Sequence, residues 1–326
     1  MNITIGIITY KRPQMLKIVL KSINNLQFKK NPALNLRRTS PNGSGKNIKP
    51  TVIVVDNDKE KSAQKIVAKM SKKFKWQIKY YCEPKKGIPQ ARNKVVKEAI
   101  KIADFVAFID DDEEADPYWL DEFIATQKKT NANCIIGKTN YKYSFELPTW
   151  YKKYRLLKHP KKTKKHSEIK SGSTNNCLIS CKVLSKYNKP FNESLRYCGG
   201  SDSDFFIKMH KKGEKIHFAK NAITYEWLHK SRTNARWLIK RTYRLSYTLS
   251  KIKLAYYHPG KITYKYIKKS IYNIISGFIL LPFSLLRGKA FFVHCLQKIA
   301  QGIGKLLGLL ETNIFEYKEY KTTHGC

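Results

Sequence analysis

Residues 105–114 read FVAFIDDDEE, an apolar run that passes directly into five consecutive carboxylates. The apolar part predicts a buried strand at 105–109. Carboxylates at this density repel one another unless a cation relieves the repulsion. In an extended chain Asp110 and Asp112 point to the same side, so they offer two hard oxygen ligands suited to Mg²⁺ or Mn²⁺. The stretch therefore predicts a strand that ends at a metal site.

A second interpretation of these acids needs no metal. A helix is expected near residues 118–130, after Pro117, and the N-terminal end of a helix favours carboxylates through its dipole. The chain holds only 24 acidic residues against 64 Lys and Arg. Because acids are scarce, five of them in one place favour the metal, and the acidic turn stays as the alternative.

Three strand and helix pairs precede this strand. The strands are expected at residues 3–9, 51–55 and 76–81, and apolar residues recur at helical spacing within 13–26, 63–70 and 91–102. This alternation predicts an α/β fold with a doubly wound, mostly parallel sheet between helices. Thr9, Asp56 and Asp110 would then lie at the carboxyl ends of strands, where open parallel sheets bind their ligands.

A set of short motifs occurs in a fixed order along the chain. They are IITYKRP at 7–13, VDN at 55–57, GIPQARN at 87–93, FIDDDE at 108–113, TNNCL at 174–178, GGSDSDFF at 199–206 and RW at 236–237. Each motif alone is weak, but the ordered set resembles glycosyltransferase family 2, and most of all its branch of succinoglycan-type exopolysaccharide transferases. The likeness covers nearly the whole chain. It implies a GT-A fold and a sugar transfer that inverts the anomeric centre.

The resemblance implies roles on the donor side. Asp110 and Asp112 would form the metal-binding Asp-x-Asp, and Asp56 would hydrogen-bond the uracil ring of a UDP-sugar. The residues implied in nucleotide-sugar binding are Thr9, Tyr10, Arg12, Asp56, Arg92 and Asp111. Mg²⁺ or Mn²⁺ would act as a Lewis acid on the departing nucleoside diphosphate, so no protein nucleophile is required.

Asp202 is the candidate catalytic base. In a single displacement a carboxylate must deprotonate the acceptor hydroxyl, and the family's acidic pair before a helix matches this residue. The chain departs from the pattern because Ser201 stands where many relatives have Glu. Ser201 and Asp204 are also spaced to cap a helix, a role that needs no catalysis. A relative that binds nucleotide sugars without transferring them is therefore an alternative.

The acceptor is expected to be a saccharide or a lipid-diphosphate-linked one. The resemblance implies that it contacts Asn176, Gly200, Arg236 and Trp237. Guanidinium groups recognise phosphate oxygens bidentately, which suits Arg236 to a diphosphate, whereas a buried helix anchor is the other interpretation of Trp237. His229 matches a late metal ligand of some GT-A enzymes, but a surface histidine is the favoured interpretation.

Three parts are expected along the chain. Residues 1–116 form the nucleotide-sugar-binding half, 117–231 the half with the acceptor site and the base, and 232–326 a basic amphipathic helical extension. The apolar run at 271–286 contains Pro282 and falls short of the roughly 20 residues that span a bilayer. We expect the extension to lie on the anionic cytoplasmic face of the inner membrane, with a soluble helical subdomain as the alternative.

The formal net charge of +40 indicates a polyanionic partner, either nucleic acid, an anionic membrane or a phosphorylated substrate, and a compositional excess of Lys on solvated faces is the alternative that needs no partner. The Lys-rich loop at 159–166 favours a nucleic-acid-binding protein as the rival function. That function leaves the acids at 110–114 unexplained, and the sequence has neither zinc-finger nor RNA-recognition signatures. We therefore expect no nucleic-acid partner.

Two further classes are excluded by missing patterns. A dinucleotide-dependent oxidoreductase would need a Gly-rich turn after the first strand, where this chain has Thr9 to Arg12. The seven cysteines are odd in number and lack paired C-x-x-C spacing, so they predict neither a disulfide framework nor a zinc site.

Overall fold

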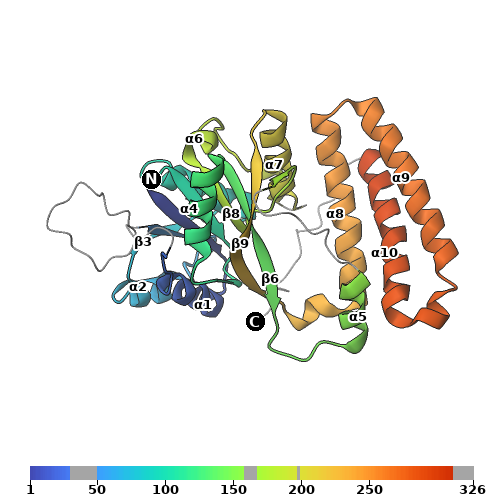
Figure 1. Ribbon diagram of the computed structural model, residues 1–326, viewed down its shortest axis with the longest axis horizontal. Helices are drawn as coiled ribbons and strands as arrows, with labels where there is room; N and C mark the ends of the chain where they lie inside the picture. The colour runs from blue at the N-terminus through green and yellow to red at the C-terminus, as the bar shows by residue number, and fades with distance from the viewer. Residues whose placement is uncertain (30–49, 158–166, 197–198, 311–326) are drawn as a thin grey trace. The chain divides into compact units, whose positions relative to one another are not determined.

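The computed structural model describes residues 1–29, 50–157, 167–196 and 199–310 (Figure 1). The basic loop predicted at 159–166 lies outside these residues. The chain divides into two compact units. The first, here called the sheet unit, comprises residues 1–142, 163–196 and 208–227, and the second, the helical unit, comprises residues 143–162, 197–207 and 228–326. The three parts expected from the sequence remain a prediction about function, since these units are defined by contacts alone.

The N-terminal half of the sheet unit has the parallel sheet that the alternation predicts. Strands β1 (Ile3–Thr9), β2 (Thr51–Asp56), β3 (Gln77–Cys82) and β4 (Phe105–Ile109) are all parallel, in the order β3-β2-β1-β4. The helices between them are α1 (Pro13–Asn24), α2 (Gln64–Ser71) and α3 (Ile88–Ala99). The register pairs Thr9 with Asp56, so β1 and β2 end side by side.

The second half makes the sheet mixed. It adds β5 (Glu113–Ala115), α4 (Trp119–Thr130), β6 (Cys134–Lys142), β7 (Glu168–Ile169), β8 (Asn176–Ser180), the short α6 (Cys181–Leu184), the 3₁₀ turn η2 (Glu193–Arg196) and β9 (Ile216–Trp227). Strand β8 is antiparallel to both β4 and β6, whereas β6 and β9 are parallel. The predicted α/β fold class is confirmed, with antiparallel pairings added beyond β4.

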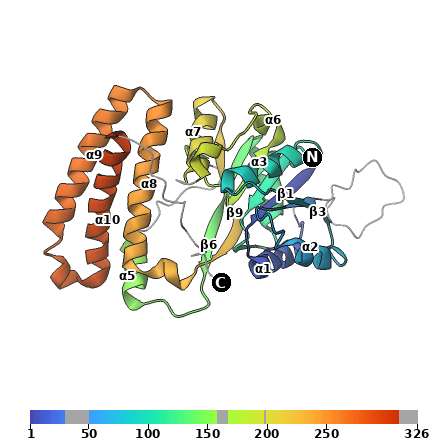
Figure 2. The ribbon, with the colours of Figure 1, turned by 180° about the vertical axis from the view of Figure 1, so that it is seen from behind.

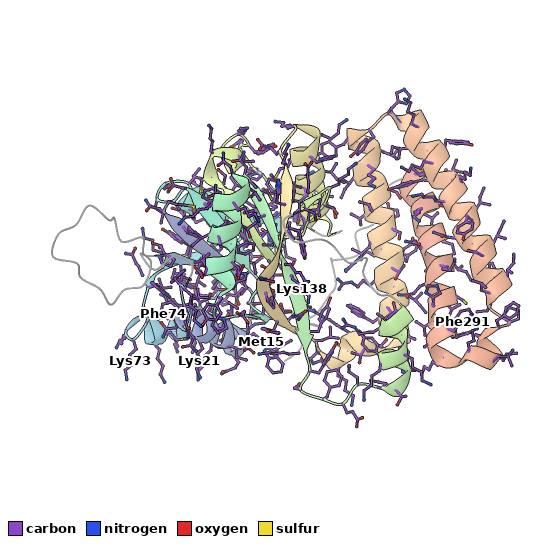
Figure 3. All side chains as sticks on the ribbon, in the orientation of Figure 1. Met15, Lys21, Lys73, Phe74, Lys138 and Phe291 are labelled. Carbon is purple, nitrogen blue, oxygen red and sulfur yellow. The ribbon has the colours of Figure 1, made fainter. Side chains whose placement is uncertain are left out.

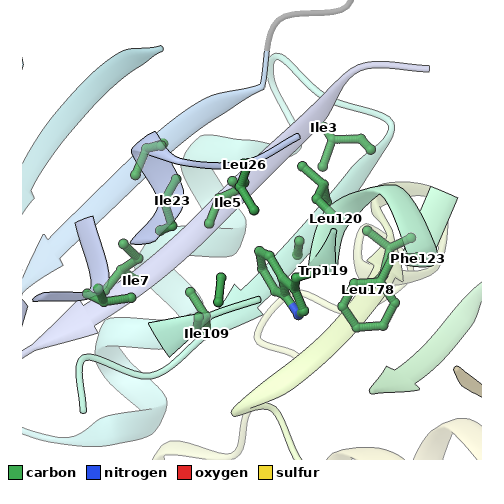
Figure 4. Close-up of a cluster of buried hydrophobic side chains, with 14 of the residues drawn as sticks. Ile3, Ile5, Ile7, Ile23, Leu26, Ile109, Trp119, Leu120, Phe123 and Leu178 are labelled. Carbon is green, nitrogen blue, oxygen red and sulfur yellow. The ribbon is translucent and has the colours of Figure 1, made fainter. Parts of the chain in front are cut away.

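Alternation along β1 explains how helices cover both faces of the sheet. Ile3, Ile5 and Ile7 are buried in one cluster with Ile23 of α1 and Trp119 of α4 (Figure 4). On the opposite face, a Cβ on Gly6 would lie 2.5 Å from Val95 of α3, so glycine lets that helix approach closely. Helices α1 and α4 thus cover one face and α3 the other (Figures 1 and 2).

Local sequence explains where α1 begins and which side it buries. Pro13 occupies the first turn, where its missing N–H costs nothing. The residues that α1 buries are Leu16, Val19, Leu20 and Ile23, a spacing that forms one stripe of a helix. Lys21 on the other side points away from the core (Figure 3).

The helical unit is built around three long helices, α8 (Ala235–Tyr256), α9 (Pro259–Leu280) and α10 (Ser284–Leu310). The unit also contains α5 (Thr149–Leu157), the start of α7 (Ser201–Lys211) and the 3₁₀ turn η3 (Lys230–Thr233). Helix α10 packs against both α8 and α9. Added Cβ atoms on Gly304 and Gly308 would lie 2.4 Å from carbonyl oxygens of α8, so these glycines allow the close packing. None of the helices described is long and apolar enough to cross a membrane.

Candidate active site

Strands β1 and β4 bring polar side chains together at their carboxyl ends. The Thr9 hydroxyl donates to Asp111 Oδ2 at 2.8 Å. Arg12, in the turn before α1, lies 3.1 Å from Asp111 and 3.5 Å from Asp112 through its Nη1 atom. The structure therefore brings together four of the predicted site residues that are about a hundred positions apart in the sequence.

Arg92 joins the same edge from α3. Its side chain is buried, and Nη2 lies 3.5 Å from Asp110 Oδ1. Its guanidinium carbon lies 5.8 Å from the centre of the Phe191 ring, in cation–π range. With Arg12 beside Asp111 and Asp112, each aspartate of the triplet has a guanidinium neighbour. Such groups also bind phosphate oxygens, so the site is able to hold a diphosphate.

Two carboxyl groups of this edge have raised pKa values despite the two arginines. Burial, helped by the charge of Asp112, outweighs the attraction of Arg12 and raises the pKa of Asp111 to about 7. Burial also raises the pKa of Glu113, as does the charge of Asp110. A divalent cation would relieve both effects, because it favours the charged form of every carboxylate near it.

The donor atoms fit Mg²⁺ or Mn²⁺. Asp110 and Asp112 supply carboxylate oxygens, the hard ligands that these cations prefer, and both remain partly exposed. Across the described ranges, no group of three or more His, Cys, Asp and Glu side chains is arranged to hold a metal. Two carboxylates are nevertheless sufficient where waters and substrate phosphates complete the coordination.

The Asp56 carboxylate forms hydrogen bonds within the turn that follows β2 and with β3. Its buried carboxylate accepts hydrogen bonds from the backbone N–H groups of Asp58 and Ala63 at 3.1 and 2.7 Å and from the Tyr80 hydroxyl at 3.0 Å. Its predicted contact with uracil stays a prediction. Tyr10, at the end of β1, lies under Lys86, whose Nζ is 4.9 Å from the ring centre.

Asn57 is a structural residue of this edge whose role was not inferred from the sequence. Its side-chain amide donates to the carbonyls of Glu83 and Lys85 at 2.8 and 2.9 Å, and its oxygen accepts from Gly87 N–H at 2.7 Å. The residue thus connects the end of β2 to the start of α3, the helix that carries Arg92. Its signals in the sequence were its place in the VDN motif and its own type, since Asn after a strand commonly organises a turn.

A second group that the sequence did not reveal surrounds the last two acids of the cluster. Asn175 donates to Glu113 at 2.6 Å. Glu114 accepts from the Trp227 indole and forms an ion pair with Lys142 at 2.8 Å. Strand β5 brings these groups together by pairing with β9. Partners this far apart in sequence leave no local pattern to detect.

Asn176 holds strands and a helix together within the sheet unit. Its oxygen accepts from the Trp119 indole at 2.8 Å, and its amide donates to the carbonyls of Lys138 and Ala222, each at 3.1 Å. The side chain is buried. Its predicted contact with an acceptor stays a prediction, and the neighbouring Asn175 is the more exposed of the two.

The predicted base and the remaining acceptor residues belong to the helical unit. Asp202 lies in the first turn of α7, with the Ser201 hydroxyl 3.5 Å from its Oδ1. Asp204 accepts from the Tyr256 hydroxyl at 2.9 Å. Gly200 has a φ of 88°, and a Cβ there would lie 2.5 Å from Thr248 of α8, so no other residue fits without strain.

Arg236 and Trp237 lie at the start of α8. Trp237 packs beside the buried cluster that contains Tyr151 and Leu238, and its ring lies 4.9 Å from the guanidinium carbon of Arg241. This packing favours the helix anchor, while Arg236 is exposed to solvent. His229 caps η3 by accepting from Ser231 N–H at 3.2 Å, in agreement with an ordinary surface histidine.

Comparison with known proteins identifies what the chain is similar to. Residues 4–187 match the family described as Glycosyl transferase family 2. The succinoglycan biosynthesis protein ExoM of Rhizobium meliloti (strain 1021) is 30% identical over 248 residues, which cover 76% of this chain and 74% of ExoM. The crystal structure of S. aureus TarS 1-349 in complex with UDP-GlcNAc matches with a TM-score of 0.54 and 14% identity over 94% of this chain and 90% of that chain. At this identity the match shows the fold alone, which is GT-A-like.

Proposed function

The chain belongs to glycosyltransferase family 2, and we propose that it transfers a sugar from a UDP-sugar to a saccharide or lipid-linked acceptor in cell-surface polysaccharide synthesis. The observation that carries the proposal is the edge of the sheet unit, where Asp110, Asp111 and Asp112 lie beside Arg12 and Arg92. ExoM is a succinoglycan biosynthesis protein, and the TarS crystal contains UDP-GlcNAc. These relatives support the substrate class.

On the donor side, the residues proposed to hold the nucleotide sugar are Thr9, Tyr10, Arg12, Asp56, Arg92 and Asp111. Arg12 and Arg92 supply positive charge for the diphosphate, and their ion pairs with the aspartates hold them at this edge. Asp110 and Asp112 would hold Mg²⁺ or Mn²⁺. When bound, the metal neutralises negative charge on the departing nucleoside diphosphate.

On the acceptor side, Asp202 is proposed as the general base. As the acceptor oxygen bonds to the anomeric carbon, its proton passes to the Asp202 carboxylate, and the bond from that carbon to the diphosphate oxygen breaks. The sugar inverts because attack and departure occur on opposite faces. The proposed acceptor contacts are Asn176, Gly200, Arg236 and Trp237. Because a lipid-diphosphate-linked acceptor lies in a membrane, we propose a peripheral location on the anionic cytoplasmic face of the inner membrane, with no nucleic-acid partner.

The decisive experiment is UDP release from a panel of UDP-sugars, with Mn²⁺, Mg²⁺ or EDTA present. Slow donor hydrolysis by water substitutes for the unidentified acceptor. We expect release from one UDP-sugar above the others, dependent on metal and abolished by EDTA. If one UDP-sugar shifts the melting temperature but no acceptor preparation ever receives the sugar, the non-catalytic alternative motivated by Ser201 holds. If no UDP-sugar is cleaved and none shifts the melting temperature, the proposed donor site is wrong.

A further inference from the structure

Helix α9 of the helical unit exposes a continuous apolar stripe. The stripe consists of Tyr264, Ile267, Ile271, Ile275 and Phe278, all at least 40% exposed, which recur at steps of three or four residues. Such a spacing places them on one side of a helix. A stripe of this length on a helix is a contact surface, because isolated apolar side chains rather than rows of them are normal on a protein surface.

The opposite side of α9 is packed in the ordinary way. Its buried residues are Ile262, Tyr266, Ser270 and Gly277. A Cβ on Gly277 would lie 2.6 Å from Ile299 of α10, and one on Gly302 would lie 2.7 Å from the Ser270 carbonyl, so the two helices are in close contact. Helix α9 therefore has one side packed against its neighbours, and the apolar stripe lies on its other, exposed side.

The turn between α9 and α10 is the most exposed apolar part of the structure described. Leu285 and Leu286 are each 89% exposed, and Phe283 beside them is 52% exposed. Gly288 has a φ of 74°, which breaks the helix just after this point. The segment Ser284–Arg287 is thus set off from the rest of α10 and presents two leucines at the end of the hairpin.

Basic residues border this apolar surface. Lys268 lies on the same side of α9 as the stripe, four residues after Tyr264 and three before Ile271, and Arg287 and Lys289 follow the exposed leucines. The guanidinium carbon of Arg287 lies 5.0 Å from the centre of the Phe291 ring, which Figure 3 labels on α10. A cation that rests on an aromatic ring beside exposed leucines has the arrangement by which side chains keep their charge at a membrane interface.

The sequence of this region contains no acid at all. Between Leu228 and Leu310 there are sixteen Lys and Arg residues and neither Asp nor Glu. A second copy of the chain would bring equal positive charge against this surface, which opposes self-association. Basic residues around an apolar surface instead complement an anionic lipid bilayer, which supplies both hydrocarbon and negative headgroups.

We propose that the apolar stripe of α9 and the leucines of the α9–α10 turn form a docking surface for an anionic bilayer. Phe283, Leu285 and Leu286 enter the interface, while Lys268 and Arg287 contact the headgroups. No described helix is able to span a bilayer, so this contact lies in the plane of the interface. The proposal deepens the membrane location and rests on the proposed function only for its purpose, access to a lipid-linked acceptor.

The test is co-sedimentation of the full-length protein with vesicles of phosphatidylcholine alone or of equal parts phosphatidylcholine and phosphatidylglycerol. We expect binding to the anionic vesicles that weakens with added salt. The double variant Leu285→Ser, Leu286→Ser should lower the partition coefficient at least about tenfold, since two side chains lose their burial in lipid. Lys268→Glu with Arg287→Glu should lower it at least about tenfold on anionic vesicles only.

Ile100→Ser is the matched control, because Ile100 is an exposed isoleucine at the end of α3 in the sheet unit, and it should bind like the wild type. Unchanged melting temperatures show that each variant folds. The proposal is overturned if the wild type binds neither kind of vesicle. It is also overturned if the double leucine variant binds anionic vesicles as well as the wild type does. It is equally overturned if that variant instead dissolves a dimer, which would make the surface an interface between copies.

Donor hydrolysis measured on the same samples separates the two proposals. The leucine variants should keep wild-type UDP release in detergent, because they change no residue of the donor site. Vesicle binding without any UDP release would defeat the proposed function and leave the docking surface standing. UDP release without vesicle binding would do the reverse.

Discussion

In the sheet unit, the three aspartates at the end of β4 each lie beside an arginine, whereas residues 228–310 of the helical unit include many lysines and arginines but neither Asp nor Glu. The first arrangement concentrates opposite charges around a small site. The second gathers sixteen Lys and Arg residues in a stretch of chain whose own sequence supplies no acid. The net charge of +40 is therefore unevenly distributed along the chain. It combines a site suited to a metal and a diphosphate with a surface suited to a polyanion.

The largest effect should follow from removing a carboxylate of the sheet unit. Asp112→Ala deletes a proposed metal ligand, and we expect UDP release to fall about a thousandfold or more, as when charge on a leaving group loses its stabilisation. EDTA should produce the same loss in the wild type and little further loss in the variant. Glu60→Ala, on an exposed glutamate of the same unit, is the control. Normal UDP release by Asp112→Ala would remove the metal from the mechanism.

A smaller loss is expected at the acid that the helical unit contributes. Asp202→Asn should lower kcat for transfer to an acceptor about a hundredfold or more, because the acceptor hydroxyl loses its base. KM for the donor should stay near the wild-type value. Asp204→Asn is the matched variant, since its side-chain oxygen still accepts from Tyr256. A loss at Asp204 with none at Asp202 would move the base by two residues.

The next prediction concerns packing in the helical unit. A Cβ on Gly304 would lie 2.4 Å from the Tyr243 carbonyl, so Gly304→Ala should lower the free energy of unfolding by about 1–3 kcal/mol through overpacking. In Gly260→Ala the nearest atom would be 3.5 Å away, in the first turn of α9, and stability should not fall. Urea midpoints measure both. Equal midpoints for the two variants would show that the close contact of α10 with α8 is not needed for stability.

Local patterns were sufficient to predict the parallel half of the sheet. Apolar runs such as Phe105–Ile109 and helical spacing such as that of α1 depend on neighbouring residues only, and the strand at 105–109 has the predicted bounds. The meeting of Thr9 with the Asp110–Asp112 stretch also followed, because parallel strands end at the same edge. Residues 176–179 were expected to be a strand, as β8 is, but its antiparallel pairing did not follow, since its place between β4 and β6 is decided by tertiary pairing.

The site was less predictable than the fold. Sequence identified Asp56 and Asn176 by motif, but not the internal hydrogen bonds that each makes in the structure. It also gave no indication that Glu114 pairs with Lys142 and Trp227, because those contacts join β5 to β6 and β9. A motif specifies which residue types are present, whereas a hydrogen-bond partner depends on how distant strands pair.

The smallest effect should be a pH-dependent one in the sheet unit. The hydrogen bond from Lys101 at 2.7 Å holds the pKa of Glu98 below its ordinary 4.5, against the opposing effect of burial and with the help of Lys94. A lowered pKa stabilises the fold above about 4.5 and ceases to do so as the pH falls through the folded value. Glu98→Gln should therefore cost about 0.5–1 kcal/mol at neutral pH.

The difference between Glu98→Gln and the wild type should close well below pH 4.5, which urea midpoints at neutral and acid pH would show. The exposed pair of Glu60 with Lys59, 3.7 Å apart, is the control, and Glu60→Gln should change neither midpoint. A difference that persists in acid would mean that the Glu98 side chain stabilises α3 by packing and not by charge. A difference that closes in acid would instead show that the charge of Glu98, held between Lys94 and Lys101, supplies the stabilisation.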